Sequence, residues 1–478
     1  MSDYKATIGL EIHAELKTQT KMFCNSKNDP DEKRPNVNIC PVCMGYPGTL
    51  PAVNLQAVKH VIRVGSAVNG EIADYTEFDR KNYFYPDIPK GYQISQYKFP
   101  LVKGGELAGV KITRIHLEED TARSSHDQGD YSLVDFNRAG VPLMELVTEP
   151  VIHSAEDATR FAKELQLLLQ TLGAGEANME KGEMRVEANI SVSKTDTFGT
   201  KVEVKNLNSF RAVERAIAYE LERHVKVLEG GGTLMQETRG WDEVKEVTFS
   251  QRAKEDSHDY RYFPDPDIPK IMVSEVPELS PDTLKKELPE LPWEKRARLG
   301  SLGLKQEDVE FFVRNLNWGS YFEDVSTALT GDISKALLAV NYLTSDLAGL
   351  IKADSTFDFS SSHLATKISA PSFGKLIDMI SQGLISSRGA KDLLKMMYES
   401  GGEDPESLAE AHNLMQKSDE GELISIVQTI INENAGVVSE YKSGKTGVIQ
   451  FLVGQGMKAT KGSGNPAVIK SLLEKLLA

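Results

Sequence analysis

The spacing of apolar residues changes once along this chain, at the proline-rich run 288–292 (LPELP). Before that run, apolar and polar residues alternate in several segments, which is typical of strands with one buried face. After it, the alternation disappears and apolar residues recur at helical spacing. The change predicts an α+β domain, rich in strands, over residues 1–292 and an all-helical region behind it. A length of 478 residues also favours several domains, because one hydrophobic core does not grow that large.

The alternation is clearest in two segments of the first region. Residues 8–16 place apolar side chains at every even position, with Glu11 and His13 between them. Residues 184–192 repeat the pattern, with Glu187 on the polar side, and a third strand is expected to start near residue 202. Because successive side chains of a strand point to opposite faces, Glu11 and His13 should share one face.

Helices are expected where capping residues precede an amphipathic stretch. Ser154, followed by Asp157, predicts a helix that runs to Gly173, and a second helix is expected over residues 209–229, ended by three glycines. Beyond the proline run we expect a helical linker domain over 293–404 and a small helical tail domain over 405–478. The helices predicted there cover residues 372–380, 387–397, 420–432 and 443–457.

Composition excludes several classes of protein. No apolar run approaches the roughly eighteen residues that a membrane-spanning helix needs, and the first residues lack the pattern of a secretion signal, so we expect a cytoplasmic protein without membrane contact. The net charge of −15 argues against a protein that coats nucleic acid non-specifically. The stretch 436–478 is nevertheless basic, since its lysines outnumber its acidic residues.

Glu11 and His13 are candidate ligands for a divalent cation, because magnesium takes oxygen ligands and manganese also accepts imidazole. An acidic run at 116–120 (HLEED) and Glu187 on another polar strand face add further carboxylates. The alternative is a solvated polar face, which is common on half-buried strands. The fold decides between the two by bringing these groups together or not.

Cys24, Cys40 and Cys43 have the spacing of a zinc knuckle. Structural zinc usually takes four ligands, and the chain has three cysteines, so two interpretations stay open: a zinc ion, or a loop whose thiols bind nothing. Three cysteines are also the wrong number for a secreted disulfide framework, and we expect reduced thiols.

No phosphate-binding loop of the Walker type is evident, since Gly444, Lys445 and Thr446 match only the tail of that motif. Nucleotide binding must therefore be of another kind. The segment 78–97 (FDRKNYFYPDIPKGYQISQY) is dense in basic and aromatic residues with little periodicity. Such a segment is typical of a binding loop or of a loop that merely covers a core.

A set of longer runs resembles one family, the B subunits of aspartyl/glutamyl-tRNA amidotransferases (GatB). The runs span the whole chain and occur in order: IGLEIHAELKT, ICPVCMGYPGTLPAVN, FDRKNYFYPDIPKGYQISQY, RIHLEED, YSLVDFNRAGVPLMELVTEP, RVEANISV, VEVKNLNSF, HDYRYFPDPDIP and FLVGQGMKATKGSGNP. The resemblance implies a kinase-like cradle domain, a helical linker and a YqeY-like tail domain that contacts tRNA.

The family's activity implies ATP and Mg²⁺ as cofactors and a misacylated tRNA as substrate. The acidic residue on Glu-tRNA(Gln) or Asp-tRNA(Asn) is phosphorylated and then amidated by ammonia, so the enzyme is a ligase that uses glutamine as amido donor. Two partners, an amidase-type glutaminase (GatA) and a small third chain (GatC), would complete a heterotrimer. Carried onto this sequence by motif, the catalytic and magnesium ligands are Glu11, His13, Glu119 and Glu187, with Glu145 and Glu118 as further candidates.

The remaining roles follow from the same resemblance. The mouth of the ammonia channel is expected near Lys81, Tyr83 and Lys90, and Lys445, Lys458 and Lys461 are expected to contact tRNA phosphates. Two positions depart from the family pattern: Ser26 stands where a further cysteine is frequent, and Glu187 where aspartate is usual.

Two other function classes compete with this enzyme. One is a non-catalytic tRNA adaptor, in which the cradle clamps the acceptor end. The other is a metal-dependent hydrolase that acts through the same carboxylates without ATP.

Overall fold

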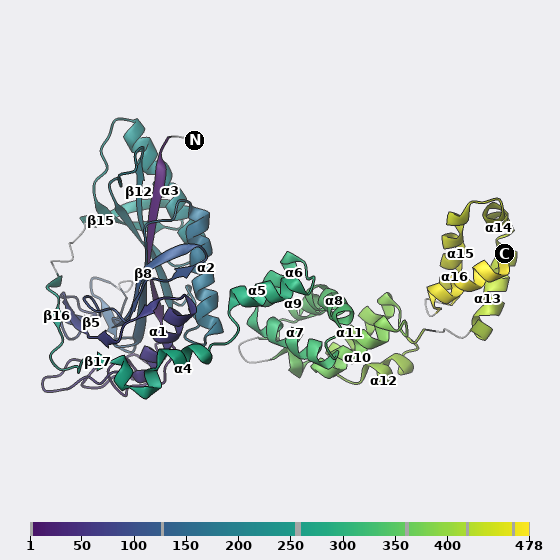
Figure 1. The fold of residues 1–478 in the computed structure, drawn as a ribbon, viewed down its shortest axis with the longest axis horizontal. Coiled ribbons are helices and arrows are strands. Elements are labelled where there is room, and N and C mark those ends of the chain that lie inside the picture. Colours follow the sequence, from purple (N-terminus) through teal and green to yellow (C-terminus); the bar gives the residue numbers. More distant parts are fainter. Residues whose placement is uncertain are drawn as a thin grey trace. The chain divides into compact units, whose positions relative to one another are not determined.

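The computed structural model describes residues 3–125, 129–253, 260–358, 363–416, 420–460 and 464–477. These residues form two compact units, Met1–Pro292 and Trp293–Ala478, each described by itself below (Figure 1). The first unit is rich in strands and the second is helical, which confirms the predicted fold class. The boundary between the units falls at the end of the proline-rich run. The further division near residue 404 stays a prediction.

One large sheet organises the first unit. Among the described residues it has ten strands in the order β15-β14-β13-β12-β1-β11-β8-β6-β2, with β7 paired to β8. Only the β13/β14 pair is parallel among these neighbours. The strands are β1 Lys5–Glu15, β2 Glu71–Ile72, β6 Val102–Lys103, β7 Glu106–Leu107, β8 Val110–Glu119, β11 Pro142–Thr148, β12 Met184–Ser193, β13 Val202–Leu207, β14 Glu237–Asp242 and β15 Val247–Ala253.

Three helices pack against the apolar face of this sheet: α1 Leu55–Ala67, α2 Ala155–Thr171 and α3 Phe210–Glu229. Even-numbered residues of β1, such as Ile8 and Ile12, are fully buried beneath them, as the alternation predicted. Ser154 caps α2 by accepting a hydrogen bond from the Asp157 N–H, and Ser209 caps α3 in the same way. Both predicted helices are therefore confirmed, and the opposite face of the sheet is left to polar side chains.

Smaller elements border the polar face. A three-stranded sheet of β16, β4 and β5 carries the aromatic and basic segment, and Ile94 of β5 donates its N–H to a side chain of β8. Two further strand pairs, β9/β10 and β3/β17, complete the unit together with helix α4. Their bounds are β3 Tyr75–Thr76, β4 Asp79–Asn82, β5 Tyr92–Ser95, β9 Arg123–Ser125, β10 Leu133–Asp135, β16 Phe263–Pro264, β17 Ile271–Met272 and α4 Pro281–Lys286.

The second unit is built from helices: α5 Pro292–Ser301, α6 Gln306–Arg314, α7 Leu316–Ala328, α8 Ile333–Asn341, α9 Ala348–Ala353, α10 Ala370–Ser381, α11 Ser387–Ser400, α12 Pro405–Ala411, α13 Glu420–Glu433, α14 Ala435–Lys442, α15 Ile449–Ala459 and α16 Pro466–Leu477. Helices α13, α15 and α16 share a hydrophobic core of their own. The helix predicted over 443–457 is wrong in its first part, because the chain turns at Gly444 (φ +101°) and helix α15 begins at Ile449. In the described part of the chain, no helix is long and apolar enough to cross a bilayer.

Candidate active site

A row of charged side chains crosses the polar face of the large sheet. The strand register places His13 of β1 opposite Glu145 of β11, and Glu145 opposite His116 of β8. On the other side of β1, Glu11 lies opposite Glu187 of β12. Residues far apart in the sequence therefore meet because neighbouring strands align them. We call these aligned side chains, together with Glu118 on the same face of β8, the charged row.

The side chains at the centre of the row are in contact. His13 Nε2 lies 3.1 Å from Glu118 Oε1 and 3.4 Å from Glu145 Oε2, while Glu11 Oε1 is 4.0 Å away. Glu118 is only 1% exposed, and its Oε2 atom has no hydrogen-bond partner among the described residues. A buried carboxylate oxygen without a partner is costly in a folded protein, so this atom is open to a further hydrogen bond or to a cation.

The pKa values show how strongly these groups act on each other. Burial, followed by repulsion from Glu145 and Glu187, raises the pKa of Glu11 to about 7. Burial opposes a charge on His13, but its hydrogen bonds to Glu118 and Glu145 outweigh that and hold the pKa of the imidazole well above its ordinary value. In this protonated state, His13 carries a positive charge that contacts the carboxylates of Glu118 and Glu145.

Three overlapping groups of the row have the spacing of metal ligands. Within each group the ligand atoms lie within 4.8 Å of one another; the groups are Glu11, His13 and Glu145; His116, Glu118 and Glu145; and Glu11, Glu187 and Glu203. In the third group an ammonium is already present, since Lys205 Nζ lies 2.8 Å from Glu187 Oε2. The first two groups are therefore the better place for a divalent cation, and Glu187 is an ion-pair partner at the edge of the site.

Glu119 does not join the charged row, which corrects its predicted place beside Glu11 and His13. Both of its carboxylate oxygens accept hydrogen bonds from Lys90 Nζ, and one also accepts the Ile94 N–H. The physical reason is the two-residue period of β8, which puts Glu118 and Glu119 on opposite faces. Glu118 and Glu145 take the place that was predicted for Glu119.

The residues predicted for a channel mouth lie in two places. Lys81 of β4 has its Nζ 5.0 Å from the centre of the Tyr260 ring and 5.8 Å from that of Tyr83. Burial works against its charge, but Glu118 together with Tyr262, Tyr83 and Glu145 outweighs burial and holds the pKa of Lys81 well above its usual value. Lys81 and Tyr83 therefore border the charged row, whereas Lys90 belongs with Glu119.

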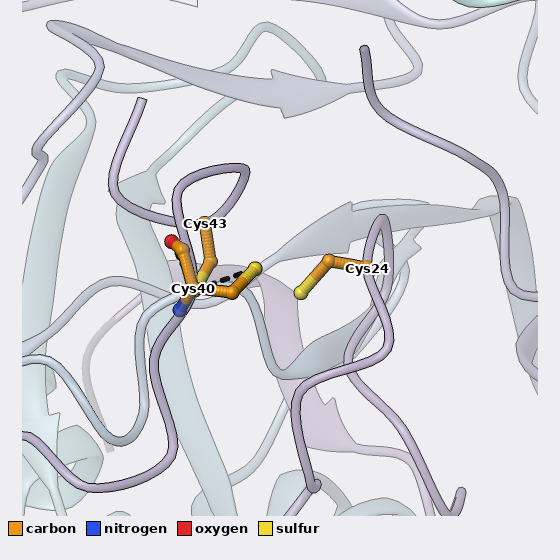
Figure 2. A group of neighbouring side chains, drawn as sticks. All are labelled: Cys24, Cys40 and Cys43. Atoms are coloured by element: carbon orange, nitrogen blue, oxygen red, sulfur yellow. Dashed lines mark hydrogen bonds between the residues drawn. The ribbon is translucent and has the colours of Figure 1, made fainter. Parts of the chain in front are cut away.

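A cavity of about 220 Å³ lies beside the Lys90 and Glu119 pair. Cys24 and Cys43 line the same cavity, and a smaller pocket of about 10 Å³ shares Cys43, Lys90 and Glu119 with it. The three cysteines come together as the zinc-knuckle spacing predicted: their sulfur atoms lie within 4.8 Å of one another (Figure 2).

Two of the three lysines that were predicted to contact tRNA lie among the described residues. Lys445 pairs with Glu440 at 3.3 Å, and Lys458 is exposed on α15. Lys461 lies outside the described residues.

Sequence reasoning missed two cations of the first unit, Lys205 and Lys21. Lys205 could have been predicted, because it lies two residues after Glu203 on a predicted strand and therefore on the same face. Lys21 is fully buried near the cysteines, and no local sequence pattern predicts that burial.

Comparison with known proteins adds to this geometry. The family described as "GatB/GatE catalytic domain" matches residues 6–277, and the one described as "GatB domain" matches residues 320–477. Similar proteins include one from Synechocystis sp., 43% identical with 100% of this chain and 98% of the relative covered, and one from Carboxydothermus hydrogenoformans, 40% identical with 100% of both covered. A third, from Thermodesulfovibrio yellowstonii, is 41% identical over 99% of both chains. All three are named as the B subunit of an aspartyl/glutamyl-tRNA(Asn/Gln) amidotransferase.

Proposed function

Because the chain belongs to the GatB family, the B subunits of tRNA-dependent amidotransferases, we propose that its charged row is the site at which the acidic residue of a misacylated tRNA is phosphorylated by ATP. As a member, the chain is part of a multi-subunit, glutamine-dependent ligase that transamidates misacylated tRNA. The proposal concerns where this happens and which side chains act. The unpartnered Glu118 oxygen beside His13 carries it.

The chemistry explains why such a site needs a cation. A carboxylate resists ammonia because oxide is a very poor leaving group, and phosphorylation supplies a better one. When bound, Mg²⁺ would neutralise phosphate oxygens during that transfer. Glu118, Glu145 and Glu11 offer the oxygen ligands that magnesium prefers, so the donor set fits. His13 can join them only as neutral imidazole, after giving up the proton that the carboxylates now hold on it.

Lys81 would act from the other side of the row. Its ammonium lies near the carboxylates, between the ring of Tyr83, which follows β4, and the ring of Tyr260. A fixed positive charge in an enclosed place attracts the phosphate groups of a nucleotide and stabilises charge that builds up on them. Lys205 provides a second cation at the opposite edge, beside Glu187.

The ammonia route is proposed along the cavity at Lys90. An acyl phosphate is open to attack by water, so ammonia should arrive through the protein. The Lys90 and Glu119 pair lines both the larger cavity and the smaller pocket, which supports a path that this ion pair interrupts. Ammonia would come from the amidase-type glutaminase partner, with the small third chain completing the heterotrimer. Tyr83 lines neither the cavity nor the smaller pocket, but its hydroxyl donates to Gln93, which lines the smaller pocket.

For tRNA, the exposed lysines of the last helices are proposed as phosphate contacts. Lys458 is free to reach a phosphate, whereas Lys445 would first have to leave Glu440. Lys461 is proposed on sequence grounds alone. Such contacts predict tRNA binding that weakens with salt.

The test is a phosphoryl-transfer assay with the assembled enzyme. Radiolabelled γ-phosphate of ATP is followed onto misacylated tRNA without glutamine, where the intermediate accumulates. Glu145→Gln should abolish the labelled product while tRNA affinity stays within a few fold. The matched control is Glu71→Gln, an exposed glutamate of the same sheet. If Glu145→Gln turns over normally at saturating tRNA, the row is a clamp and the adaptor function replaces the kinase; release of the free amino acid from the tRNA without ATP would indicate a hydrolase.

A further inference from the structure

One face of β8 carries three successive polar side chains, each with a buried atom that lacks a partner. The atoms are Arg114 Nε, His116 Nδ1 and Glu118 Oε2, and none has a hydrogen bond among the described residues. Because alternate residues of a strand point to the same face, the three side chains leave the strand about 7 Å apart from one to the next. Buried polar atoms without partners are costly, so this part of the sheet is open to a ligand that accepts hydrogen bonds at the Arg114 end and binds a cation at the Glu118 end.

Glu145 joins Arg114 to the proposed cation site. Its Oε1 accepts a hydrogen bond from Arg114 Nη2 at 3.2 Å, while its Oε2 lies 3.4 Å from His13 Nε2 and 3.5 Å from His116 Nε2. One carboxylate therefore separates the guanidinium from the candidate metal ligands. Because only Nη2 is used in this hydrogen bond, the Nε–H of the same planar group is left to donate to a second oxygen.

The reaction brings two anions together at this site, and Arg114 suits one of them better. A carboxylate oxygen of the misacylated tRNA attacks the γ-phosphorus of ATP, and the bond from phosphorus to the bridging oxygen breaks, so that ADP leaves with the electron pair. A guanidinium bound to the attacking carboxylate would hold the lone pairs that have to form the new bond. The same hydrogen bond to a non-bridging γ-oxygen leaves the nucleophile free and offsets the charge on the transferred group.

We infer that Arg114 binds a non-bridging oxygen of the γ-phosphoryl group of ATP through its Nε–H and aligns that group beside the cation site. Its role there rests on the proposed function, which puts phosphoryl transfer in the charged row. Arg114 differs from Lys81, since an ammonium acts as a point charge whereas the guanidinium fork fixes the direction of the bound oxygen. Lys103 of β6 lies opposite Arg114 in the strand register but is exposed, so it offers no such fixed contact.

Nucleotide binding to the assembled enzyme tests this role without turnover. With magnesium present, isothermal titration compares AMPPNP, an ATP analogue that is not hydrolysed, with ADP, which lacks the γ-phosphoryl group. Arg114→Met should weaken the binding of AMPPNP by about 10- to 100-fold, as loss of a hydrogen bond to a charged group does, and leave ADP binding within about twofold. Lys103→Met is the matched control and should bind both nucleotides as wild type does.

Three other results would overturn this role. Equal weakening of both nucleotides in Arg114→Met would mean that Arg114 supports the fold of the site and not the γ-phosphoryl group. Unchanged affinity for AMPPNP would refute the contact, and a loss of affinity for misacylated but not for uncharged tRNA would then assign Arg114 to the substrate carboxylate. If wild type itself binds neither nucleotide, the proposed function fails as well, which distinguishes that failure from an error about Arg114 alone.

A structure of the wild-type enzyme with magnesium and AMPPNP needs no variant. A γ-phosphoryl oxygen should lie within about 3.2 Å of Arg114 Nε. A γ-phosphoryl group beyond hydrogen-bond reach of Arg114 would contradict the inference, even where the substituted chain fails to assemble.

Discussion

Two buried clusters of charge in the first unit differ in how completely their charges are matched. On helix α3, Glu220 is fully buried and accepts hydrogen bonds from Arg223 at 2.9 and 2.8 Å and from the Thr248 hydroxyl. Arg239 Nε adds a charge 3.3 Å away. Burial alone would raise the pKa of Glu220, but His224, Arg223 and Thr248 outweigh it and lower it to about 2. Every oxygen of this carboxylate has a partner.

The charged row shows the opposite balance. There the pKa of Glu11 is raised to about 7, and one buried oxygen of Glu118 has no partner among the described residues. A matched cluster ties a helix to its sheet, whereas an unmatched one costs folding free energy until a ligand arrives. This difference in carboxylate pairing is our reason to propose the charged row, and not the Glu220 cluster, as the functional site.

The largest expected effect is on activity and should separate the two clusters. Glu118→Gln keeps an acceptor for His13 but removes the charge that a cation needs. We expect phosphoryl transfer to fall by about 10³-fold, equivalent to about 4 kcal/mol of transition-state stabilisation. The free energy of unfolding should fall only slightly, because Glu145 still pairs with His13 and the lost charge includes an oxygen that has no partner among the described residues. Single-turnover kinetics and urea unfolding of the same preparation measure both; a marked loss of stability would place Glu118 with the structural group.

The second expected effect is a loss of stability, and it concerns the Glu220 cluster rather than the charged row. Glu220→Gln leaves Arg223 without the carboxylate that it pairs with, whereas Arg239 keeps its pair with Glu237. Breaking such a buried pair costs about 3 kcal/mol. Because the folded pKa lies below the ordinary value of 4.5, Glu220 stabilises the protein fully above that value and loses its contribution as pH falls toward about 2. The gap between wild type and variant should therefore shrink in acid. Urea unfolding at neutral pH and near pH 3 checks this, and a gap that does not change with pH would contradict it.

Much of the local structure behind this comparison could be predicted from the sequence. The two-residue period placed Glu11 and His13 on one face, and Ser154 and Ser209 announced helices α2 and α3. These signals are local, since the strand period and a helix cap are properties of neighbouring residues. The recognised runs supplied the family and its chemistry.

What the sequence could not supply was the partner of each carboxylate. The register of β8 against β11 shifts between Val147 and Thr148, so alternation along β8 changes phase and its polar face is hard to assign. Glu119 was carried over from the family motif, which gives no register and so did not separate Glu119 from Glu118. Nor does a local pattern reveal that Glu220 meets Arg239, because their contact depends on how α3 packs against β14.

The smallest effect is a pH dependence of the metal-free protein that Glu11 of the charged row should cause. Because the folded pKa of Glu11 is about 7 against an ordinary 4.5, its contribution to stability is full below 4.5 and is lost as pH rises through about 7. Its side chain is 29% exposed, so the loss should be about 1 to 2 kcal/mol. Glu11→Gln has no proton to lose and should become more stable than wild type by that amount at pH 8, with equal stability near pH 5. Unfolding curves at both pH values, with chelator and with added magnesium, provide the measurement. Magnesium should stabilise wild type more than Glu11→Gln, because the variant has lost one of three carboxylate ligands; equal gains in both proteins would mean that Glu11 is not a ligand.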